Sequence, residues 1–207
     1  MVIADDHPFY RRGLARLLRK TGIEVVGEAP NGEEAIRAAA ETRPDVVIMD
    51  LNMPGLSGLE ATRRLIERAP GSRVLMLSVS AQEADVSNAI MAGASGYVLK
   101  DEPGEEIIAA IEVTASGESM ISPRIAAVLL RRVQTSIEAG EDLAGGGLSA
   151  AELEVLGLLA DGRSEDDIAR VVDLGPATVG TYISSILRKL ELERRVVDAS
   201  AARKSRD

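Results

Sequence analysis

Residues 46–58 read Val-Val-Ile-Met-Asp-Leu-Asn-Met-Pro-Gly-Leu-Ser-Gly, and this stretch decides the fold. It opens with four apolar residues, a run that is too short for a helix and contains the β-branched residues that favour strands. The segment Met53-Pro54-Gly55 has the composition of a shaped turn. From Gly58 onward, apolar residues recur at helical spacing. The stretch therefore predicts a buried strand that ends at Asp50 and leads through a turn into a helix.

The same order of strand, turn and helix repeats from Met1 to about Gly117. Five short apolar runs carry the pattern: Val2–Ala4, Ile23–Val26, Val46–Met49, Val74–Leu77 and Tyr97–Leu99. The segments between these runs have helical periodicity, and prolines stop two of the helices. Parallel strands joined by right-handed crossovers form an open sheet that is covered by helices on both faces. The sequence thus predicts an α/β fold with a doubly wound, five-stranded parallel sheet of the flavodoxin-like type.

The composition excludes several classes of function. The 207 residues are 45% hydrophobic and 28% charged, as in a folded globular chain. The absence of cysteine excludes disulfides and thiolate sites, and the single histidine disfavours a zinc enzyme. With 2% aromatic residues, stacking on nucleic-acid bases is nearly ruled out. No apolar run reaches the roughly 18 residues of a membrane span, so we expect a cytoplasmic protein without a membrane partner.

Polar side chains stand where the predicted strands end. Asp5 and Asp6 follow the first strand, and Asp50 follows the third. If these two strands are neighbours, the three carboxylates meet in the crevice at the carboxyl edge of the sheet. Packed carboxylates repel one another unless a cation neutralises them, and oxygen ligands favour Mg²⁺. Two further strand ends add the hydroxyl of Ser78 and the ammonium of Lys100, so the combined site is suited to a phosphoryl group.

These residues resemble the receiver domain of two-component response regulators. The resemblance covers roughly residues 1–120 and is carried by Asp5-Asp6-His7-Pro8, the run Asp50-Leu51-Asn52-Met53-Pro54-Gly55 with Gly58 three residues later, Ser78, and Gly96-Tyr97-Val98-Leu99-Lys100. In this resemblance His7 belongs to the loop that enters the first helix and has no direct part in the chemistry.

The resemblance implies a role for each residue of the site. A partner histidine kinase phosphorylates Asp50, Asp6 binds Mg²⁺ directly, and Asp5 helps through water. Asp50 and the backbone carbonyl of Asn52 are the further candidate ligands of Mg²⁺. Ser78 and Lys100 hold the phosphoryl oxygens, and Tyr97 turns inward as the switch. The signal is then expected to reach the face formed by the fourth helix, the fifth strand and the last receiver helix, which repacks or dimerises.

The remainder of the chain predicts a linker and a small helical domain. Ser122-Pro123 predicts the start of a helix that ends near Val133, and the glycine-rich stretch 134–147 predicts a flexible linker. The last sixty or so residues show only helical periodicity, which is typical of a small all-α bundle. Ser149 and Glu152 have the spacing of a capping box at its first helix. We therefore divide the chain into a receiver domain (1–120), a linker helix with a flexible linker (121–147) and a helical domain (148–207).

The helical domain resembles the LuxR-type helix-turn-helix of the NarL/FixJ-like subgroup of response regulators. Matching positions are Leu148-Ser149, Glu152, Glu154-Val155-Leu156, Leu159-Ala160, Gly162, Ser164, Ile168-Ala169, Thr178-Val179, Ile183, Ile186 and Lys189-Leu190. The resemblance implies a turn at 173–175 and a recognition helix from about Pro176 to Leu190 in the major groove of DNA. Candidate contacts to phosphates or base edges are Thr178, Thr181, Ser184, Ser185, Arg188 and Lys189.

Departures from the family pattern cluster where DNA would be touched. Family members usually place arginine near 151, Asn-Lys near 165 and 166, serine at 175, lysine at 180 and histidine at 182. This chain has Ala151, Glu165-Asp166, Gly175, Gly180 and Tyr182. Each lost phosphate contact weakens binding, and the net charge of −9 disfavours nonspecific binding by the whole chain.

Two functions therefore stay open. The favoured one is a phosphorylation-activated response regulator that controls transcription by binding DNA, with a homodimer multiplying the affinity of two half-sites. The alternative is a phospho-switched regulator whose degenerate helix-turn-helix domain binds a protein partner instead of DNA. In both cases we expect no enzyme activity beyond slow loss of the protein's own phosphoryl group.

Overall fold

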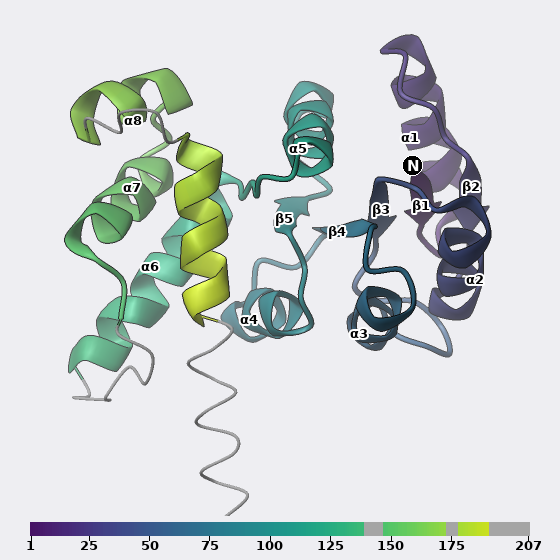
Figure 1. The fold of residues 1–207 in the computed structure, drawn as a ribbon, viewed down its shortest axis with the longest axis horizontal. Helices are drawn as coiled ribbons and strands as arrows, with labels where there is room; N and C mark the ends of the chain where they lie inside the picture. Colours follow the sequence, from purple (N-terminus) through teal and green to yellow (C-terminus); the bar gives the residue numbers. More distant parts are fainter. Residues whose placement is uncertain (139–146, 173–177, 191–207) are drawn as a thin grey trace, which may run out of the picture.

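The computed structural model describes residues 1–138, 147–172 and 178–190. Its first part is a parallel five-stranded sheet in the order β2-β1-β3-β4-β5, with helices on both faces (Figure 1). The strands are β1 (Val2–Ala4), β2 (Gly27–Ala29), β3 (Val46–Met49), β4 (Arg73–Ser78) and β5 (Gly96–Leu99). The helices that cover them are α1 (Pro8–Lys20), α2 (Gly32–Thr42), α3 (Gly58–Arg68), α4 (Glu83–Met91) and α5 (Gly104–Ser116). The predicted doubly wound fold is confirmed.

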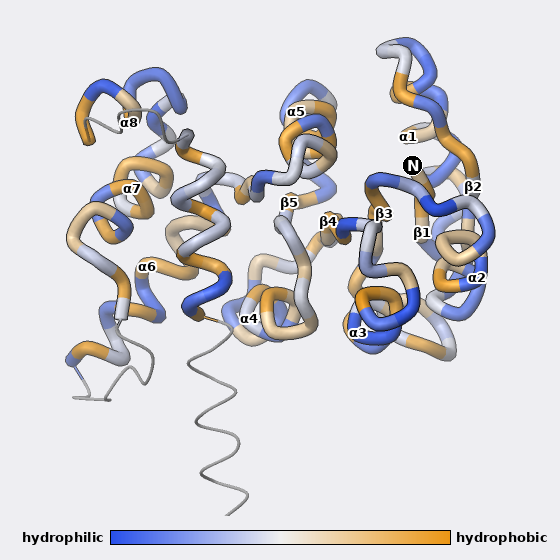
Figure 2. The backbone as a smooth tube through the Cα atoms, viewed as in Figure 1, coloured by the Kyte–Doolittle hydropathy of each residue, from blue (hydrophilic) through white to orange (hydrophobic). Residues whose placement is uncertain are grey.

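Each face of the sheet has its own hydrophobic core. Ile3, Ile48 and Leu75 pack with the buried residues of α1 and α5. Their strand neighbours Val47 and Met49 point to the opposite face and pack with α2, α3 and α4. Every residue of β3 and β5 is buried, because a parallel sheet is covered on both sides. Figure 2 shows both colours along α1 and α3, whose hydrophobic residues face the sheet.

The second strand lies further along the chain than the sequence predicts. The apolar run Ile23–Val26 was the expected strand, but β2 is Gly27–Ala29, which pairs in parallel with β1. The residues before β2 complete the end of α1, where the Ile23 amide donates to the Leu18 carbonyl (3.2 Å). Ile23 packs against the α1 and α5 core from there. Hydrophobicity alone does not reveal this difference, because Ile23 and Val25 are half-buried by packing on the core outside any strand, while Val26 is exposed.

The turn after β3 depends on Gly58. The Gly58 amide donates to the Leu51 carbonyl at 3.0 Å, which brings the start of α3 against the end of β3. A Cβ atom on Gly58 would lie 1.9 Å from the backbone oxygen of Asp50. Ser57 caps α3 by accepting a hydrogen bond from the Glu60 amide. The close approach of the two backbones therefore fixes where Asp50 leaves the strand.

The helices after α5 pack against the receiver part. They are α6 (Pro123–Glu138), α7 (Ala150–Ala160), α8 (Glu165–Val172) and an unlabelled helix at residues 179–190, drawn in yellow in Figure 1. α6 contacts both α7 and α4, so one apolar cluster runs from the sheet into the helical part. α6 ends at Glu138, five residues beyond the predicted end at Val133. Residues 139–146 of the predicted linker and the predicted turn at 173–175 lie outside the described residues. The capping box of Ser149 and Glu152 is present at α7. Among the described helices, none has the length and hydrophobicity to cross a lipid bilayer.

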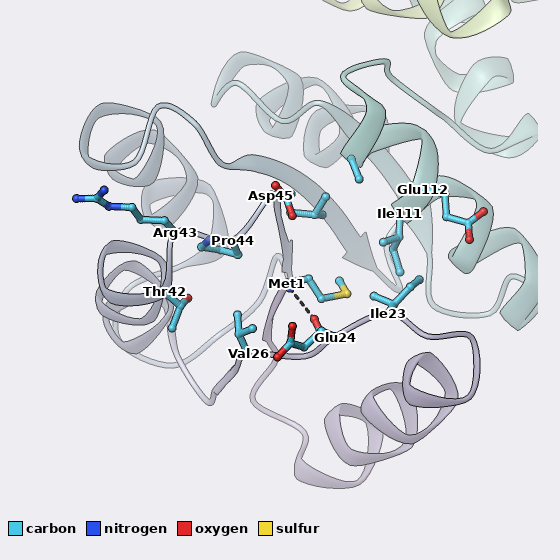
Figure 3. A pocket seen from close by; sticks show the side chains of 12 residues that line it. Met1, Ile23, Glu24, Val26, Thr42, Arg43, Pro44, Asp45, Ile111 and Glu112 are labelled. Carbon is cyan, nitrogen blue, oxygen red and sulfur yellow. Dashed lines mark hydrogen bonds between the residues drawn. The ribbon is translucent and has the colours of Figure 1, made fainter.

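A pocket of about 380 Å³ lies at the amino end of the strands (Figure 3). It is lined by Met1, Ile23, Glu24, Val26, Thr42, Arg43, Pro44, Asp45, Val46, Ile111, Glu112 and Ala115. Within it, the amino group of Met1 donates to the Glu24 carbonyl at 2.7 Å. The pocket shares no residue with the predicted acidic site, which follows the opposite ends of the strands.

We expect Gly58→Ala to lower the free energy of unfolding by more than about 2 kcal/mol, because the added methyl group meets immovable backbone atoms. Urea unfolding followed by circular dichroism measures the change. Gly13→Ala in α1 is the matched control, since nothing lies within 4 Å of its Cβ position and alanine favours the helix. Equal stabilities of the two variants would contradict the role of Gly58.

Candidate functional site

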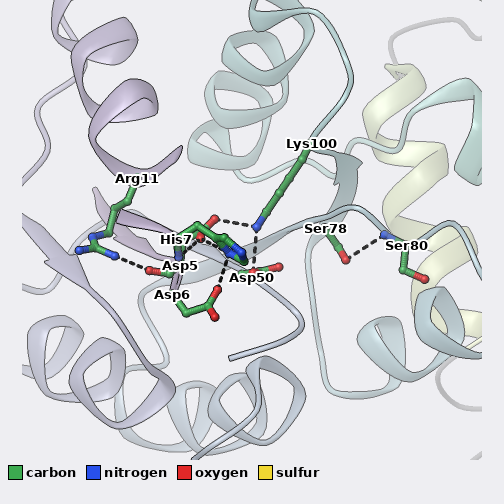
Figure 4. A network of polar contacts seen from close by, with 8 residues as sticks. All are labelled: Asp5, Asp6, His7, Arg11, Asp50, Ser78, Ser80 and Lys100. Carbon is green, nitrogen blue, oxygen red and sulfur yellow. Dashed lines mark hydrogen bonds and ion pairs between the residues drawn. The ribbon is translucent and has the colours of Figure 1, made fainter. Parts of the chain in front are cut away.

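Three carboxylates and one ammonium converge at the carboxyl edge of the sheet (Figure 4). β1 and β3 are neighbours, so Asp5 and Asp50 leave the sheet side by side. The Lys100 Nζ atom lies 2.8 Å from Asp5 Oδ2 and 2.8 Å from Asp50 Oδ2. Both of these carboxylates are buried, and Asp6 lies beside them. The site is therefore a buried group of negative charges held around a single lysine.

The electrostatics of this group are unbalanced. Burial raises the pKa of Asp50, with a further contribution from Asp5, and Lys100 counteracts the rise. Burial alone would lower the pKa of Lys100, but its hydrogen bonds to the two carboxylates outweigh this effect and raise the pKa. One ammonium cannot neutralise Asp5, Asp6 and Asp50 together. The site thus retains negative charge in a poorly solvated place, which favours a bound cation.

The donor atoms of the site fit a hard divalent cation. One ligand atom from each of Asp5, Asp6, His7 and Asp50 lies within 4.8 Å of the others. Asp6 Oδ1 is buried and accepts no hydrogen bond from the described residues, although His7 Nδ1 is 2.6 Å away. A buried carboxylate oxygen without a hydrogen bond is costly unless it binds an ion or water. Three carboxylates match the oxygen ligands that Mg²⁺ prefers. Asn52 is exposed, two residues beyond Asp50.

Ser78 and Tyr97 are connected through Ser80. Ser78 is fully buried at the end of β4, and its Oγ atom accepts a hydrogen bond from the Ser80 amide (3.2 Å). The Tyr97 hydroxyl donates to the Ser80 carbonyl (2.8 Å). Tyr97 is itself fully buried, and this burial raises its pKa to about 12. The structure therefore has the aromatic ring in its inward position, with a short polar path to the hydroxyl at the site.

Two residues near the acids, Tyr10 and Arg11, escaped the sequence reasoning. His7 lies in the loop before α1, as predicted, and its ring lies against Asp6. The Lys100 ammonium lies 5.0 Å from the centre of the Tyr10 ring, a cation–π contact. Arg11 Nη1 donates to the Asp5 carbonyl at 2.5 Å. The positions of Tyr10 and Arg11, three and four residues after His7 at the start of a predicted helix, were the available signal.

The six candidate DNA contacts differ in whether their side chains have partners within the chain. Ser184 is hydrogen-bonded to Ser119 of the receiver part (2.9 Å), and Ser185 donates to Glu152 Oε1 (2.8 Å). Lys189 Nζ lies 2.7 Å from Glu152 Oε2. These three side chains therefore have partners within the chain. Thr178 and Thr181 bond to each other at 2.9 Å and are exposed, as is Arg188.

Gly180 brings the helix of residues 179–190 against the receiver part. A Cβ atom at 180 would lie 2.4 Å from Glu118 Oε2 and 2.9 Å from Glu118 Cβ. The lysine that family members usually have at this position would not fit here without moving Glu118. We call the packing of helix 179–190 on residues 117–119 the closed arrangement. In it, the face that carries Gly180 and Ser184 is turned towards the receiver part.

Glu152 links α7 to helix 179–190. Its carboxylate accepts hydrogen bonds from the Ser149 amide (2.6 Å), the Ser185 hydroxyl and the Lys189 ammonium. Burial alone would raise the pKa of Glu152, but these bonds lower it to about 2. Lys189 therefore holds the bundle together, and the sequence alone did not distinguish this role from a DNA contact.

The fold and the site define a class of protein. Its members have a receiver domain, with an acidic site of the type that accepts a phosphoryl group, joined to a helical output domain. Comparison with protein families agrees on both parts. Residues 1–112 match the response regulator receiver domain, and residues 147–202 match the bacterial regulatory proteins of the luxR family. The chain therefore belongs to the two-component response regulators with a LuxR-type helix-turn-helix domain, which bind DNA to regulate transcription.

Three similar proteins span nearly the whole chain, and a fourth spans about two thirds of it. The nitrate/nitrite response regulator NarL of Escherichia coli K12 is 36% identical over 197 residues, which cover 95% of this chain and 91% of NarL. The DNA-binding transcriptional activator DevR/DosR of Mycobacterium tuberculosis is 38% identical over 194 residues, 93% of this chain and 88% of that protein. The crystal structure of the response regulator ChrA, from a heme-sensing two-component system, covers 99% of this chain and 96% of ChrA, with a TM-score of 0.54 and 35% identity. A LuxR-family regulator from an Aurantimonas species covers 64% of this chain and 96% of its own, with a TM-score of 0.60 and 41% identity.

We expect Glu152→Gln to lower the free energy of unfolding at neutral pH by about 2 kcal/mol, because Lys189 loses its charged partner. The pKa of Glu152 is lowered from 4.5 to about 2, so the carboxylate stabilises the fold above pH 4.5. This contribution is lost as the pH falls through the folded-state pKa, and the difference between variant and parent should shrink in the same range. Urea unfolding at pH 7 and pH 3 measures it. Glu154→Gln, at an exposed position of the same helix, is the control. A deficit that persists unchanged at low pH would exclude the charge effect.

Proposed function

We propose that Asp50 accepts a phosphoryl group from a partner histidine kinase and that this event controls DNA binding by the helical domain. The observation that carries the proposal is the contact of Lys100 with both Asp5 and Asp50 beside Asp6, which gathers an ammonium and three carboxylates at one edge of the sheet. Asp5, Asp6, Asp50 and the Asn52 carbonyl would hold Mg²⁺, which when bound offsets the repulsion between carboxylates and phosphate.

The residues of this chain account for the transfer. An Asp50 carboxylate oxygen attacks the phosphorus atom of the kinase phosphohistidine, a P–O bond forms, and the P–N bond breaks. The imidazole leaves and takes a proton. Lys100 and the Ser78 hydroxyl then meet the oxygens of the transferred group. The reaction makes this chain an acceptor and not an enzyme, apart from slow hydrolysis of its own acyl phosphate.

The switch is proposed to run through Ser78 and Ser80 to Tyr97. A hydroxyl drawn towards the phosphoryl group moves the segment whose carbonyl accepts the Tyr97 hydrogen bond. Tyr97 belongs to the same apolar cluster as α4 and α6. Repacking there would loosen the closed arrangement and expose the face of α4, β5 and α5 for a homodimer.

Phosphorylation is tested with the full chain, Mg²⁺ and a small acyl phosphate donor. We expect intact-mass spectrometry to find one added phosphoryl group, and peptide mapping to place it on Asp50. Asp50→Asn or removal of Mg²⁺ with EDTA should abolish the addition. Asp45→Asn, at the exposed opposite end of β3, should leave it intact. An unmodified mass in the presence of Mg²⁺ contradicts the proposed function.

DNA binding is proposed to require opening of the closed arrangement. The comparisons support DNA as the partner, and no finding supports the alternative of a protein partner. Glu165 and Asp166 add negative charge to this domain, so we expect weak binding with a shallow salt dependence.

We expect Gly180→Lys to raise the affinity for duplex DNA by about tenfold at low salt, because it adds a phosphate contact and collides with Glu118. Hydrogen exchange of the amides at 117–120 should increase in the same variant. Thr181→Lys adds the same charge at an exposed neighbouring position and should raise the affinity without changing the exchange. If neither variant gains affinity, the helix is not the DNA interface. If exchange is unchanged in Gly180→Lys, Gly180 does not hold the arrangement closed.

A further inference from the structure

The boundary between the receiver part and helix 179–190 contains a cavity of about 210 Å³. Arg73 at the start of β4, Gly117 at the end of α5 and Ser119 line it from the receiver side. Ser184 and Arg188 line it from the helix, one turn apart. Because residues of both the receiver part and helix 179–190 line it, the cavity exists only in the closed arrangement.

The charge that faces this cavity is positive and unpaired. Neither Arg73 nor Arg188 has a carboxylate within ion-pair distance among the described residues, whereas Arg64, Arg124 and Arg170 each have one. No acidic residue lines the cavity. Glu118 is the nearby acid, and it is turned towards Gly180. In a chain with a net charge of −9, two arginines directed to one cavity without a partner favour an anionic ligand.

Two hydroxyls complete the lining. The Ser184 hydroxyl donates its one hydrogen to the Gly180 carbonyl (2.8 Å), so at the 2.9 Å contact between the two serines the Ser119 hydroxyl donates to Ser184 Oγ. Ser119 is buried. Gly117 has no side chain, and Arg73 Nη2 lies 3.1 Å from the place where a Cβ would be. The guanidinium therefore lies directly over the chain beside Ser119.

We propose that this cavity binds a small phosphate-class dianion that bridges Arg73 and Arg188. The volume is several times the roughly 30 Å³ that one water molecule occupies in the liquid, so a tetrahedral oxyanion and a water molecule fit. Guanidinium groups bind such oxyanions through paired, charge-assisted hydrogen bonds. The ligand joins the receiver part to helix 179–190, so it stabilises the closed arrangement by mass action.

Anion binding and DNA binding then oppose each other. The bridged state holds Arg188 and the face of Ser184 away from DNA, and linkage requires that each ligand weakens the other by the same factor. This consequence rests on the proposed DNA-binding function, whereas binding of the anion to the cavity does not. The two parts are therefore tested separately.

Binding is measured by isothermal titration calorimetry of inorganic phosphate into the full chain, with EDTA present and ionic strength held constant with chloride. We expect saturable binding at one site, weakened about tenfold or more by Arg73→Gln and by Arg188→Gln. Arg68→Gln removes the same charge from an exposed site on α3 and should bind like the parent.

Absence of saturable binding by the parent chain overturns the proposal. So does unchanged affinity in both arginine variants. In a second measurement, phosphate should lower the affinity for duplex DNA more than chloride at equal ionic strength, and Arg73→Gln should remove this excess. If phosphate binds the cavity but has no such effect, the site stands and its link to DNA binding fails.

Discussion

The contact of Lys100 with Asp5 and Asp50 is the interaction on which the site depends. Two buried carboxylates repel each other, and the ammonium 2.8 Å from both is the charge that lets them remain together. Its compensation is incomplete, because Asp6 adds a further negative charge. This excess of negative charge destabilises the folded state, and it also favours binding of a cation and then of a phosphoryl group. Stability and function therefore draw on one arrangement of charges.

The structure gives a second explanation for the small residues on the surface of helix 179–190. Gly180 and Ser184 look like losses from a DNA-binding face when only the sequence is considered. In the structure, Gly180 permits close approach to Glu118, and Ser184 bonds to Ser119. Small side chains at these positions suit a helix that packs on its own receiver domain. The weak basic character of the helix and its close packing are thus two consequences of the same residues.

Local patterns predicted much of the fold and the acidic site. The alternation of apolar runs and helical segments gave the doubly wound sheet, and acids at the ends of the first and third strands indicated a shared crevice. The second strand was misplaced, because Ile23 and Val25 are half-buried by packing on the core of α1 and α5, whereas Gly27–Ala29 pair with β1. The role of Lys189 could not be predicted from the sequence for a similar reason. Only its position next to Glu152 in space shows that it forms an internal ion pair, and the sequence also allowed a DNA contact.

The sequence by itself determined the two-part architecture, the identity of the acidic residues and the depletion of basic residues in the helical part. These follow from periodicity, from the ends of strands and from charge, which are properties of neighbouring residues along the chain. Only the tertiary structure decided that Tyr97 is inward, that α6 joins the two parts and that Arg73 and Arg188 share a cavity. Such relations join residues far apart in sequence, and they arise from how packed surfaces fit, which no local pattern encodes.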